Sequence, residues 1–195
     1  HPRDPKRLYL GYYDIGLLIS TDGGATFGRH MQGVAPKTCA NSCLAIAFDP
    51  DDPEHLWASF GQWHENEGVV GESSDGGRTW TMIGMPETGL PTARHRPLIV
   101  DASSPTHARR LYTVAEGRGV FASGDGGHSW QARNTALPHT DIRDLAQGPR
   151  DPTTLICALG DNKAGPGALC ASGDAGHSWK PINPALPPAD IKAMV

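Results

Sequence analysis

The sequence predicts an all-β repeat fold, and three observations lead to this prediction. A motif of the form S-x-D-x-G-x-[ST]-[WF] occurs four times along the 195 residues. Gly and Pro number 24 and 17 without any collagen-like period, which suits many short strands joined by tight turns. The motif recurs about every 50 residues, which is the length of a four-stranded antiparallel blade with its connections. A β-propeller is therefore expected.

The four motif segments, here called Asp boxes, have an even spacing that chance matches would not keep. Their aspartates, Asp22, Asp75, Asp125 and Asp174, are 53, 50 and 49 residues apart. A D-P or G-P pair, a β-rich strand, a Gly-led strand and an aromatic strand recur around the boxes. We expect one propeller domain with repeats at about 1–42, 43–94, 95–141 and 142–190, and a further strand starting at 191–195.

Each Asp box has the composition of a hairpin tip. The Asp carboxylate is suited to accept hydrogen bonds from the backbone N–H groups of the turn, and Gly supplies the positive φ that such turns need. The Ser or Thr hydroxyl helps to satisfy the loop. The aromatic residues that end the boxes are expected to wedge between neighbouring blades as structural staples: Phe27, Trp80, Trp130 and Trp179.

The four boxes resemble those of the Asp-box (BNR) β-propeller superfamily. That superfamily includes sialidases, xyloglucanase-type glycosidases, sortilin-like receptors and photosystem assembly factors, and its boxes do not catalyse. Because one fold hosts enzymes, receptors and assembly proteins, function has to be argued from the site. Superfamily rings usually have six or more blades, so the resemblance implies about half of a larger ring. The alternative is a four-bladed ring that residues 191–195 close.

Strands should run outward from the channel in each blade, with innermost strands at Cys43–Phe48, Arg96–Val100, Arg143–Gln147 and Ile191–Val195, and none in the first blade. The connections opposite the boxes then gather on one face, where a ligand would bind.

Carboxylates in these connections are candidate catalytic groups. Asp14, in Tyr13-Asp-Ile-Gly16, resembles the D-[VI]-G motif that carries a catalytic aspartate in xyloglucanase-type glycosidases. Glycoside hydrolysis normally needs a second carboxyl group. Glu67 and Glu116 fall at or near the equivalent repeat position and are the candidates. The alternative is that all three are solvated or turn-capping acids.

Cations and aromatic residues on the same face are candidate binding groups. Arg96, Arg143 and Lys192 occupy equivalent positions at the channel mouth, where they are suited to hold a carboxylate or phosphate. Trp63 and His64 lie in a long connection that suits sugar stacking or a protein contact. No His, Cys or Asp spacing matches a metal site, so neither a metal nor a cofactor is expected.

The net charge and the cysteine positions limit the choice of partner and of cellular compartment. A net charge of −4 disfavours nucleic acid as a partner, and no apolar run approaches the length of a membrane span. Cys157 and Cys170 are expected on facing strands, and Cys39 and Cys43 in one connection, so two local disulfides are expected. Such pairing favours the periplasm or the extracellular space, and buried free thiols are the alternative.

These patterns favour an extracytoplasmic propeller that acts as a binding or scaffold module and docks to a larger protein assembly. The first alternative is a glycoside hydrolase of the xyloglucanase type, which uses Asp14 and a second carboxylate. The second alternative is an accessory or assembly subunit of a membrane complex, for example a photosynthetic one. The partner is then a protein or a carbohydrate.

Overall fold

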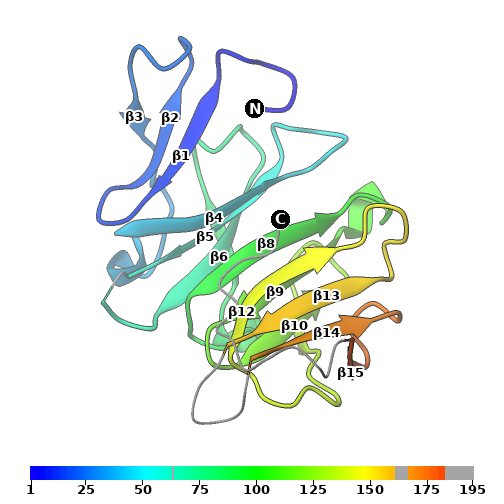
Figure 1. The fold of residues 1–195 in the computed structure, drawn as a ribbon. Coiled ribbons are helices and arrows are strands. Elements are labelled where there is room, and N and C mark those ends of the chain that lie inside the picture. Colours follow the sequence, from blue (N-terminus) through cyan, green and yellow to red (C-terminus); the bar gives the residue numbers. More distant parts are fainter. Residues whose placement is uncertain (63, 161–166, 183–195) are drawn as a thin grey trace.

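Four antiparallel sheets follow one another along the chain (Figure 1). The computed structural model describes residues 1–62, 64–160 and 167–182. The first sheet has three strands and each of the other three has four. The prediction of an all-β fold made of antiparallel propeller blades is confirmed.

Each sheet is one blade, numbered here in chain order. Blade 1 contains β1 (Leu8–Tyr12), β2 (Gly16–Ser20) and β3 (Gly28–Arg29). The other three blades contain these strands: β4 (Ser42–Phe48), β5 (Leu56–Gly61), β6 (Gly68–Ser73) and β7 (Thr81–Gly84) in blade 2; β8 (His95–Asp101), β9 (Arg110–Ala115), β10 (Gly119–Ser123) and β11 (Gln131–Ala132) in blade 3; β12 (Ile142–Gln147), β13 (Leu155–Leu159), β14 (Ala168–Ser172) and β15 (Lys180–Pro181) in blade 4.

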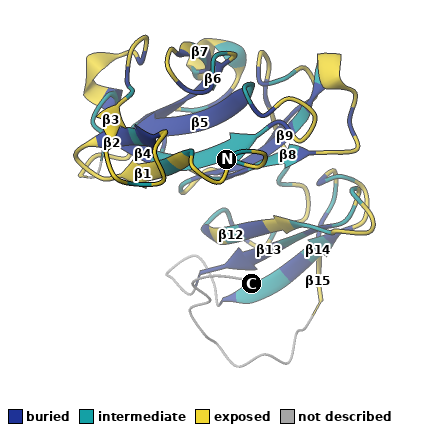
Figure 2. Cartoon of the chain, turned by 90° about the horizontal axis from the view of Figure 1, so that it is seen from above, coloured by how far each residue is buried: buried dark blue, intermediate teal, exposed yellow. Residues whose placement is uncertain are grey.

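The first strand of each four-stranded blade lies on the channel side. Strand β8 lies beside both β4 and β12, so these three strands face a common axis (Figure 2). Strand β1 occupies the second position of its blade, because it pairs with β2 as β5 pairs with β6. Among the described residues no strand pairs with the other edge of β1. The expected innermost strand at Ile191–Val195 lies outside the described residues.

The hydrophobic core is divided into three parts, one between each pair of consecutive blades. Trp80 packs with residues of blade 1, Trp130 with residues of blade 2 and Trp179 with residues of blade 3. The indole Nε1 of Trp80 donates to the carbonyl of His30, and that of Trp179 donates to the carbonyl of Arg133. Three box aromatics therefore hold neighbouring blades together.

The four Asp boxes have the same hydrogen bonds. In the second box, Ser73 Oγ donates to Asp75 Oδ1 at 2.7 Å, and the Thr79 hydroxyl donates to Asp75 Oδ2 at 2.6 Å. The Thr79 N–H donates to Oδ1 at 2.9 Å, and the Gly77 N–H donates to Ser73 Oγ. The carboxylate thus replaces the missing backbone partners of a tight turn. These bonds lower the pKa of Asp75 to about 2, although partial burial acts to raise it.

Backbone hydrogen bonds define two opposite faces of the molecule. On the box face, each box turn bonds to the preceding connection of its own blade, as in the bond from Gly76 N–H to the Glu54 carbonyl. On the loop face, the connections that follow the second strand of a blade bond to the connection that enters the blade. Examples are the bonds from Glu116 N–H to the Arg94 carbonyl and from Gly160 N–H to the Asp141 carbonyl.

A buried ion pair joins blades 2 and 3 on the box face. The Arg109 guanidinium, between η3 (Thr106–Ala108) and β9, donates to both oxygens of Asp49 at 2.7 Å and also bonds to Asp51. Arg109 and Asp49 are both almost fully buried. The hydrogen bond to Asp49 is the main cause that raises the pKa of Arg109. This contact joins the connection after β4 to the connection before β9.

The four cysteines are buried free thiols, so neither expected disulfide is formed in the structure. Cys157 on β13 lies directly opposite Cys170 on β14, as the repeat alignment predicts. Cys39 ends η1 (Lys37–Cys39), whereas Cys43 lies in β4 and its thiol is directed along its own strand to the Ala45 carbonyl. Burial raises the pKa of Cys43 to about 12.

Candidate functional site

The candidate site begins with a shared irregularity in the three channel strands. The pairing of β4, β8 and β12 with their neighbours shifts register next to Cys43, His95 and Ile142. Such bulges leave one or more residues out of the ladder and re-aim their side chains. The residues skipped in the ladder include these three: Leu44, Arg96 and Arg143. The residues that the repeat alignment places at equivalent positions are therefore the bulge residues of these three strands.

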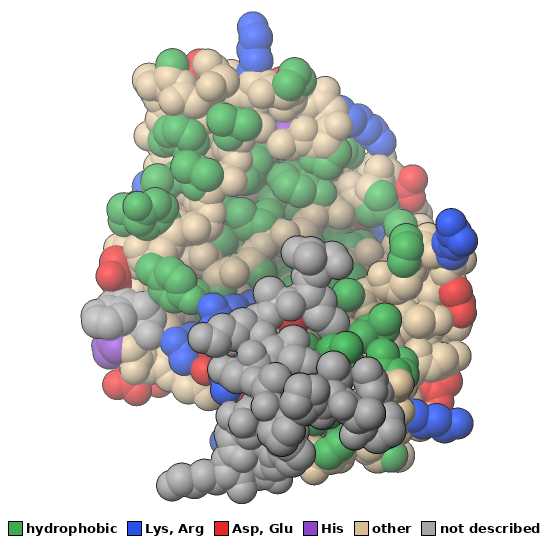
Figure 3. Space-filling view, in the orientation of Figure 1, with side chains coloured by type: hydrophobic (Ala, Val, Ile, Leu, Met, Phe, Trp, Pro, Cys, Tyr) green, Lys and Arg blue, Asp and Glu red, His purple; other side chains and the backbone are tan. Residues whose placement is uncertain are grey.

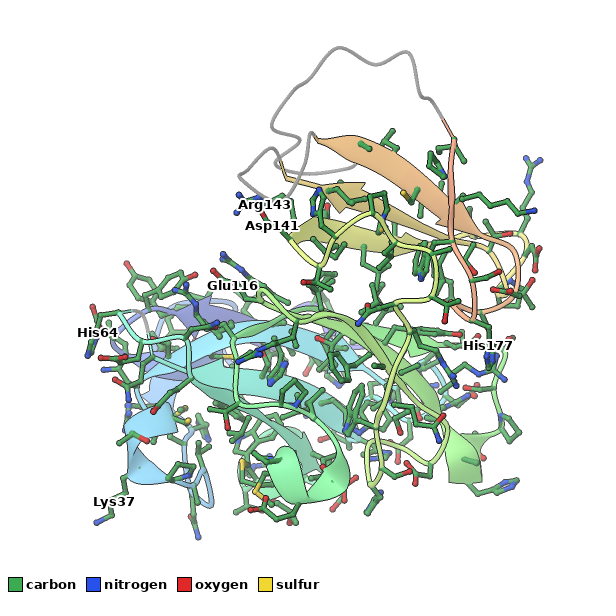
Figure 4. All side chains as sticks on the ribbon, turned by 90° about the horizontal axis from the view of Figure 1, so that it is seen from below. Lys37, His64, Glu116, Asp141, Arg143 and His177 are labelled. Atoms are coloured by element: carbon green, nitrogen blue, oxygen red, sulfur yellow. The ribbon has the colours of Figure 1, made fainter. Side chains whose placement is uncertain are left out.

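Two of these bulge residues line one pocket at the loop face. A pocket of about 40 Å³ is lined by Arg96, Val114, Glu116, Ile142 and Arg143. Arg96 and Glu116 come from blade 3, and Arg143 comes from blade 4. Figure 4 shows Arg143 and Asp141 next to each other, with Glu116 near them on the adjoining blade. The structure thus brings together two predicted binding cations and one predicted carboxylate.

The charges around this pocket are unequally compensated. Arg94 forms a bidentate ion pair with Glu116, with N···O distances of 2.8 and 2.9 Å. Arg143 pairs with Asp141 at 3.1 Å. Arg96 instead donates to the neutral hydroxyl of Tyr13 at 2.9 Å and has no ion pair with a described residue. Arg96 therefore supplies positive charge that no described carboxylate cancels.

A buried histidine lies next to the bulge in β8. His95 precedes Arg96 in β8 and is completely buried, and its carbonyl accepts a hydrogen bond from Ser59 Oγ on β5. Burial lowers the pKa of His95 to about 4. Its imidazole is therefore neutral at physiological pH, and the positive charge of the site comes from the arginines.

Asp14 lies in the turn that joins β1 and β2 on the loop face. Its φ is +64°, a left-handed conformation that Asp tolerates better than most residues, and its N–H donates to Ser42 Oγ. The glycine that follows in the motif, Gly16, has φ +92°, and a Cβ there would lie 2.6 Å from Met31 Sδ. The turn presents Asp14 as an exposed carboxylate.

The two expected partner carboxylates of Asp14 line different pockets. Glu67 accepts a hydrogen bond from Gln62 and lines a pocket of about 320 Å³ that Glu87 and Met85 also line. Glu116 lines the smaller pocket and is held by Arg94. The Arg94 guanidinium therefore occupies both carboxylate oxygens of Glu116.

The remaining predicted binding residues lie apart from the pocket or outside the description. His64 is exposed on the loop face, and Figure 4 shows it well separated from Glu116 and Arg143. Trp63 and Lys192 lie outside the described residues. His177 belongs to an Asp box at the far end of the molecule in the same view.

Sequence reasoning missed Tyr13 and Arg94, although both contact pocket residues. Neither position repeats in the other blades, so the repeat alignment carries no signal for them. Within residues 1–62, 64–160 and 167–182, no group of three His, Cys, Asp or Glu side chains is arranged to hold a metal ion. No helix in the same ranges has the length and apolar character of a membrane span.

No family model matches the chain. It is 30% identical over 143 residues to a probable oligoxyloglucan-reducing end-specific xyloglucanase of Neosartorya fischeri, an alignment that covers 67% of this chain and 16% of the relative. It is 32% identical over 117 residues to a xyloglucanase of a Paenibacillus species, covering 54% of this chain and 11% of the relative. The chain thus spans less than a fifth of the length of either relative.

Solved structures show the same fold. An ancestral GH74 enzyme matches with a TM-score of 0.71 at 20% identity, over 93% of this chain and 24% of that one. The Niastella koreensis GH74 enzyme matches with a TM-score of 0.69 at 16% identity, over 92% of this chain and 28% of that one. YCF48 bound to a D1 peptide matches with a TM-score of 0.62 at 16% identity, over 94% of this chain and 51% of that one.

Proposed function

Because this chain forms blades of a β-propeller of the kind found in GH74 xyloglucanases and YCF48, we propose that it is a binding module whose loop face docks a protein partner through a carboxylate. The site is the pocket that Arg96 and Arg143 line. The observation that carries the proposal is the position of Arg96, a bulge residue whose guanidinium donates to a neutral hydroxyl and forms no ion pair with a described carboxylate.

Charge and geometry favour an anionic group as the ligand. A guanidinium presents its N–H donors in a planar fork that matches the two oxygens of a carboxylate. Arg143, from the next blade, adds a second guanidinium to the same pocket, whereas Glu116 is already neutralised by Arg94. An incoming carboxylate then forms charge-assisted hydrogen bonds without displacing an existing ion pair of Arg96.

The size of the pocket favours a peptide over a sugar. Small-molecule sites usually measure roughly 300–1,000 Å³, because they enclose most of their ligand. At about 40 Å³, this pocket admits a single carboxylate rather than a sugar ring. The C-terminal carboxylate of a protein fits this space while the rest of the partner lies across the loop face. We also propose a location outside the cytoplasm, in the periplasm or extracellular space, which the facing positions of Cys157 and Cys170 on β13 and β14 support.

The test compares peptides that end in a free carboxylate with the same peptides amidated at the C-terminus, measured by calorimetry with the whole chain. We expect binding of the free acids to weaken roughly tenfold in Arg96→Ala, the loss of about one charge-assisted hydrogen bond. Arg78→Ala is the matched control, because Arg78 is an exposed arginine of the second Asp box. Equal binding of acid and amide peptides would refute the proposal.

A second candidate function is glycoside hydrolysis of the xyloglucanase type. The identity to two xyloglucanases and the exposed Asp14 in its left-handed turn favour it. The separation of Glu67 and Glu116 into different pockets argues against a complete acid and base pair among the described residues. Release of reducing ends from xyloglucan, lost in Asp14→Asn and retained in Arg96→Ala, would establish hydrolysis in place of peptide docking.

The accessory-subunit alternative is a special case of docking. The fold likeness to YCF48, which is bound to a D1 peptide in its solved structure, supports it. It adds a membrane complex as the source of the carboxylate. Cofractionation of the tagged chain with a detergent-solubilised complex, abolished in Arg96→Ala, is the expected result for this alternative.

A further inference from the structure

A pocket on the loop face, here called the glutamate pocket, shares no lining residue with the pocket at Arg96. It measures about 320 Å³, which is within the range of small-molecule sites, roughly 300–1,000 Å³. One wall comes from η1, another from Glu67 and the start of β6, and the third from the segment around η2 (Pro86–Thr88). The residues that line it lie between positions 36 and 92, well inside the chain.

Hydrogen bonds and close packing hold the walls of the glutamate pocket in place. In η1 the Cys39 N–H donates to the carbonyl three residues earlier at 2.9 Å, and in η2 the Thr88 N–H donates to the carbonyl three residues earlier at 3.0 Å. A Cβ at Gly68 would lie 2.4 Å from the Ala93 carbonyl oxygen, so the start of β6 lies directly against the connection that enters blade 3. The walls are therefore set by backbone contacts and are formed without any ligand.

The two glutamates of the pocket carry negative charge that no described residue compensates. Glu67 accepts a hydrogen bond at 3.1 Å from the side-chain amide of Gln62, which is neutral. Neither Glu67 nor Glu87 forms an ion pair within the part of the chain that the structure describes. Lys37 of η1 does not line the pocket, and Figure 4 shows its side chain extending outward from the molecule. A cation bound in the pocket therefore relieves the repulsion between two like charges.

The rest of the lining favours an aliphatic cation over an anion or a sugar. Pro36 and Pro86 have no backbone N–H, so two positions of the wall cannot donate to an anion. Val69 and Met85 supply apolar side chains that suit an aliphatic stem. Among the described residues that line the pocket none is aromatic, so a sugar ring finds no side chain on which to stack. Burial raises the pKa of Cys39, so its thiol stays protonated and the charge of the pocket is that of its glutamates.

The attraction for a cation is local, because charges of both signs are interspersed on the surface. On the face that Figure 3 shows, Lys and Arg side chains alternate with Asp and Glu side chains around the edge. We propose that the glutamate pocket binds an aliphatic ammonium group, with its N–H donors on Glu67 and Glu87 and its carbon chain against Val69 and Met85. This site is independent of the carboxylate docking proposed at Arg96.

Nuclear magnetic resonance of the isotope-labelled whole chain tests the proposal, with diaminopentane as the probe and pentanediol as its neutral counterpart. We expect the diamine to shift the backbone amide signals of Thr38, Val69 and Thr92, which line the pocket, and the diol to leave them unchanged. The amide of Gly126, in an Asp box on the opposite face, should not respond. A diol that binds as tightly as the diamine would overturn the proposal, because recognition would then not depend on charge.

Substitutions of the two glutamates test their roles separately. Glu67→Gln and Glu87→Gln keep the size of each side chain and remove its charge, and each is expected to weaken diamine binding roughly tenfold, the loss of about one charge-assisted hydrogen bond. Glu65→Gln is the matched control, because Glu65 is exposed in the same connection as Glu67 and does not line the pocket. Circular dichroism checks that every variant keeps its fold. Equal binding by all three variants would trace the attraction to the net charge of −4 and contradict the proposal.

The natural ligand is either a free amine or the lysine side chain of a protein, and a peptide separates the two sources. Acetyl-Gly-Lys-Gly-amide is compared with the same peptide that carries norleucine in place of lysine. Tighter binding of the lysine peptide than of the diamine would assign the pocket to a protein side chain, and the reverse order would assign it to a free amine. The proposal fails if neither probe shifts the pocket amides, or if calcium ions or a xyloglucan oligosaccharide shift them instead.

Discussion

One buried ion pair joins blades 2 and 3. Asp49 follows the channel strand of blade 2, and Arg109 precedes the second strand of blade 3. Both are removed from water, so each depends on the other for much of its charge compensation. Burial acts to raise the pKa of Asp49, but the hydrogen bonds from Arg109 and from backbone N–H groups outweigh it, and the pKa is lowered. The carboxylate therefore stays ionised in the fold.

Arg109→Ala is expected to lower the free energy of unfolding by about 3–5 kcal/mol, because it leaves Asp49 buried without its partner. Urea unfolding followed by tryptophan fluorescence measures this loss. Arg150→Ala is the control, since Arg150 is an exposed arginine on the connection between β12 and β13. Its loss should cost about 1 kcal/mol or less. Equal losses for the two variants would contradict the role given to the buried pair.

His95 makes the stability of the chain depend on pH. Its pKa is lowered by burial from 6.5 to about 4, so the unfolded chain takes up a proton at a higher pH than the folded chain. Its contribution to stability is complete above pH 6.5 and declines as the pH falls toward 4, by about 3 kcal/mol in all. The difference between the wild type and His95→Gln, measured by urea unfolding at pH 7 and pH 4.5, should shrink at the lower pH. A difference that is independent of pH would refute this account.

At the scale of elements, the Asp box is a turn whose hydrogen bonds come from its own side chains. Two hydrogen-bond distances are the same in all four boxes. The first Ser of the box donates to one Asp oxygen at 2.7 Å, and the later Ser or Thr hydroxyl donates to the other Asp oxygen at 2.6 Å. The Thr26 hydroxyl is the first cause that lowers the pKa of Asp22 to about 2, followed by the Thr26 N–H and the Ser20 hydroxyl. The box is therefore built to hold an ionised aspartate.

Asp75→Ala should lower the free energy of unfolding by about 2 kcal/mol, because the Thr79 hydroxyl and two turn N–H groups lose their acceptor. Glu87→Ala, an exposed change on the loop face, is the control and should have little effect. The effect of Asp75→Ala should persist above pH 3.8 and fade as the pH drops toward 2, where the Asp75 carboxylate of the folded wild type becomes protonated. Thermal unfolding at pH 7 and pH 2.5 measures both parts.

The sequence predicts elements of this fold better than it predicts the candidate site. The box motif carries turn chemistry within eight residues, so the boxes at Asp22 and Asp75 and the strands around them are readable from the chain alone. The site depends on contacts between distant residues, such as Arg96 with Tyr13, which are 83 positions apart. Register shifts have no local signature, so the repeat alignment places Arg96 and Arg143 at one level but cannot show that they leave the ladder.

At the scale of the whole molecule, stability is distributed along the chain of blades. Strand β5 is buried at every position, whereas β1 is largely exposed and has one edge without a described partner. Repeat proteins of this kind gain much of their stability from neighbouring-unit interfaces. The blades covered on both sides are therefore more protected than the blade at the start of the chain.

Hydrogen exchange followed by mass spectrometry should show this gradient. Peptides from β5 and β9 should exchange most slowly, and peptides from β1 should exchange fastest among the second strands of the blades. Uniform exchange across the four blades would contradict a stability that resides in the interfaces between them.

The bulges in β4, β8 and β12 also have a consequence for how recognition can diverge. Leu44, Arg96 and Arg143 stand outside all three interblade cores, so a change at any of them leaves the packing of the scaffold untouched. One blade can therefore exchange its residue without repacking the interblade cores. Each bulge residue at the channel mouth can thus be substituted separately, and new binding specificities can be engineered there one blade at a time.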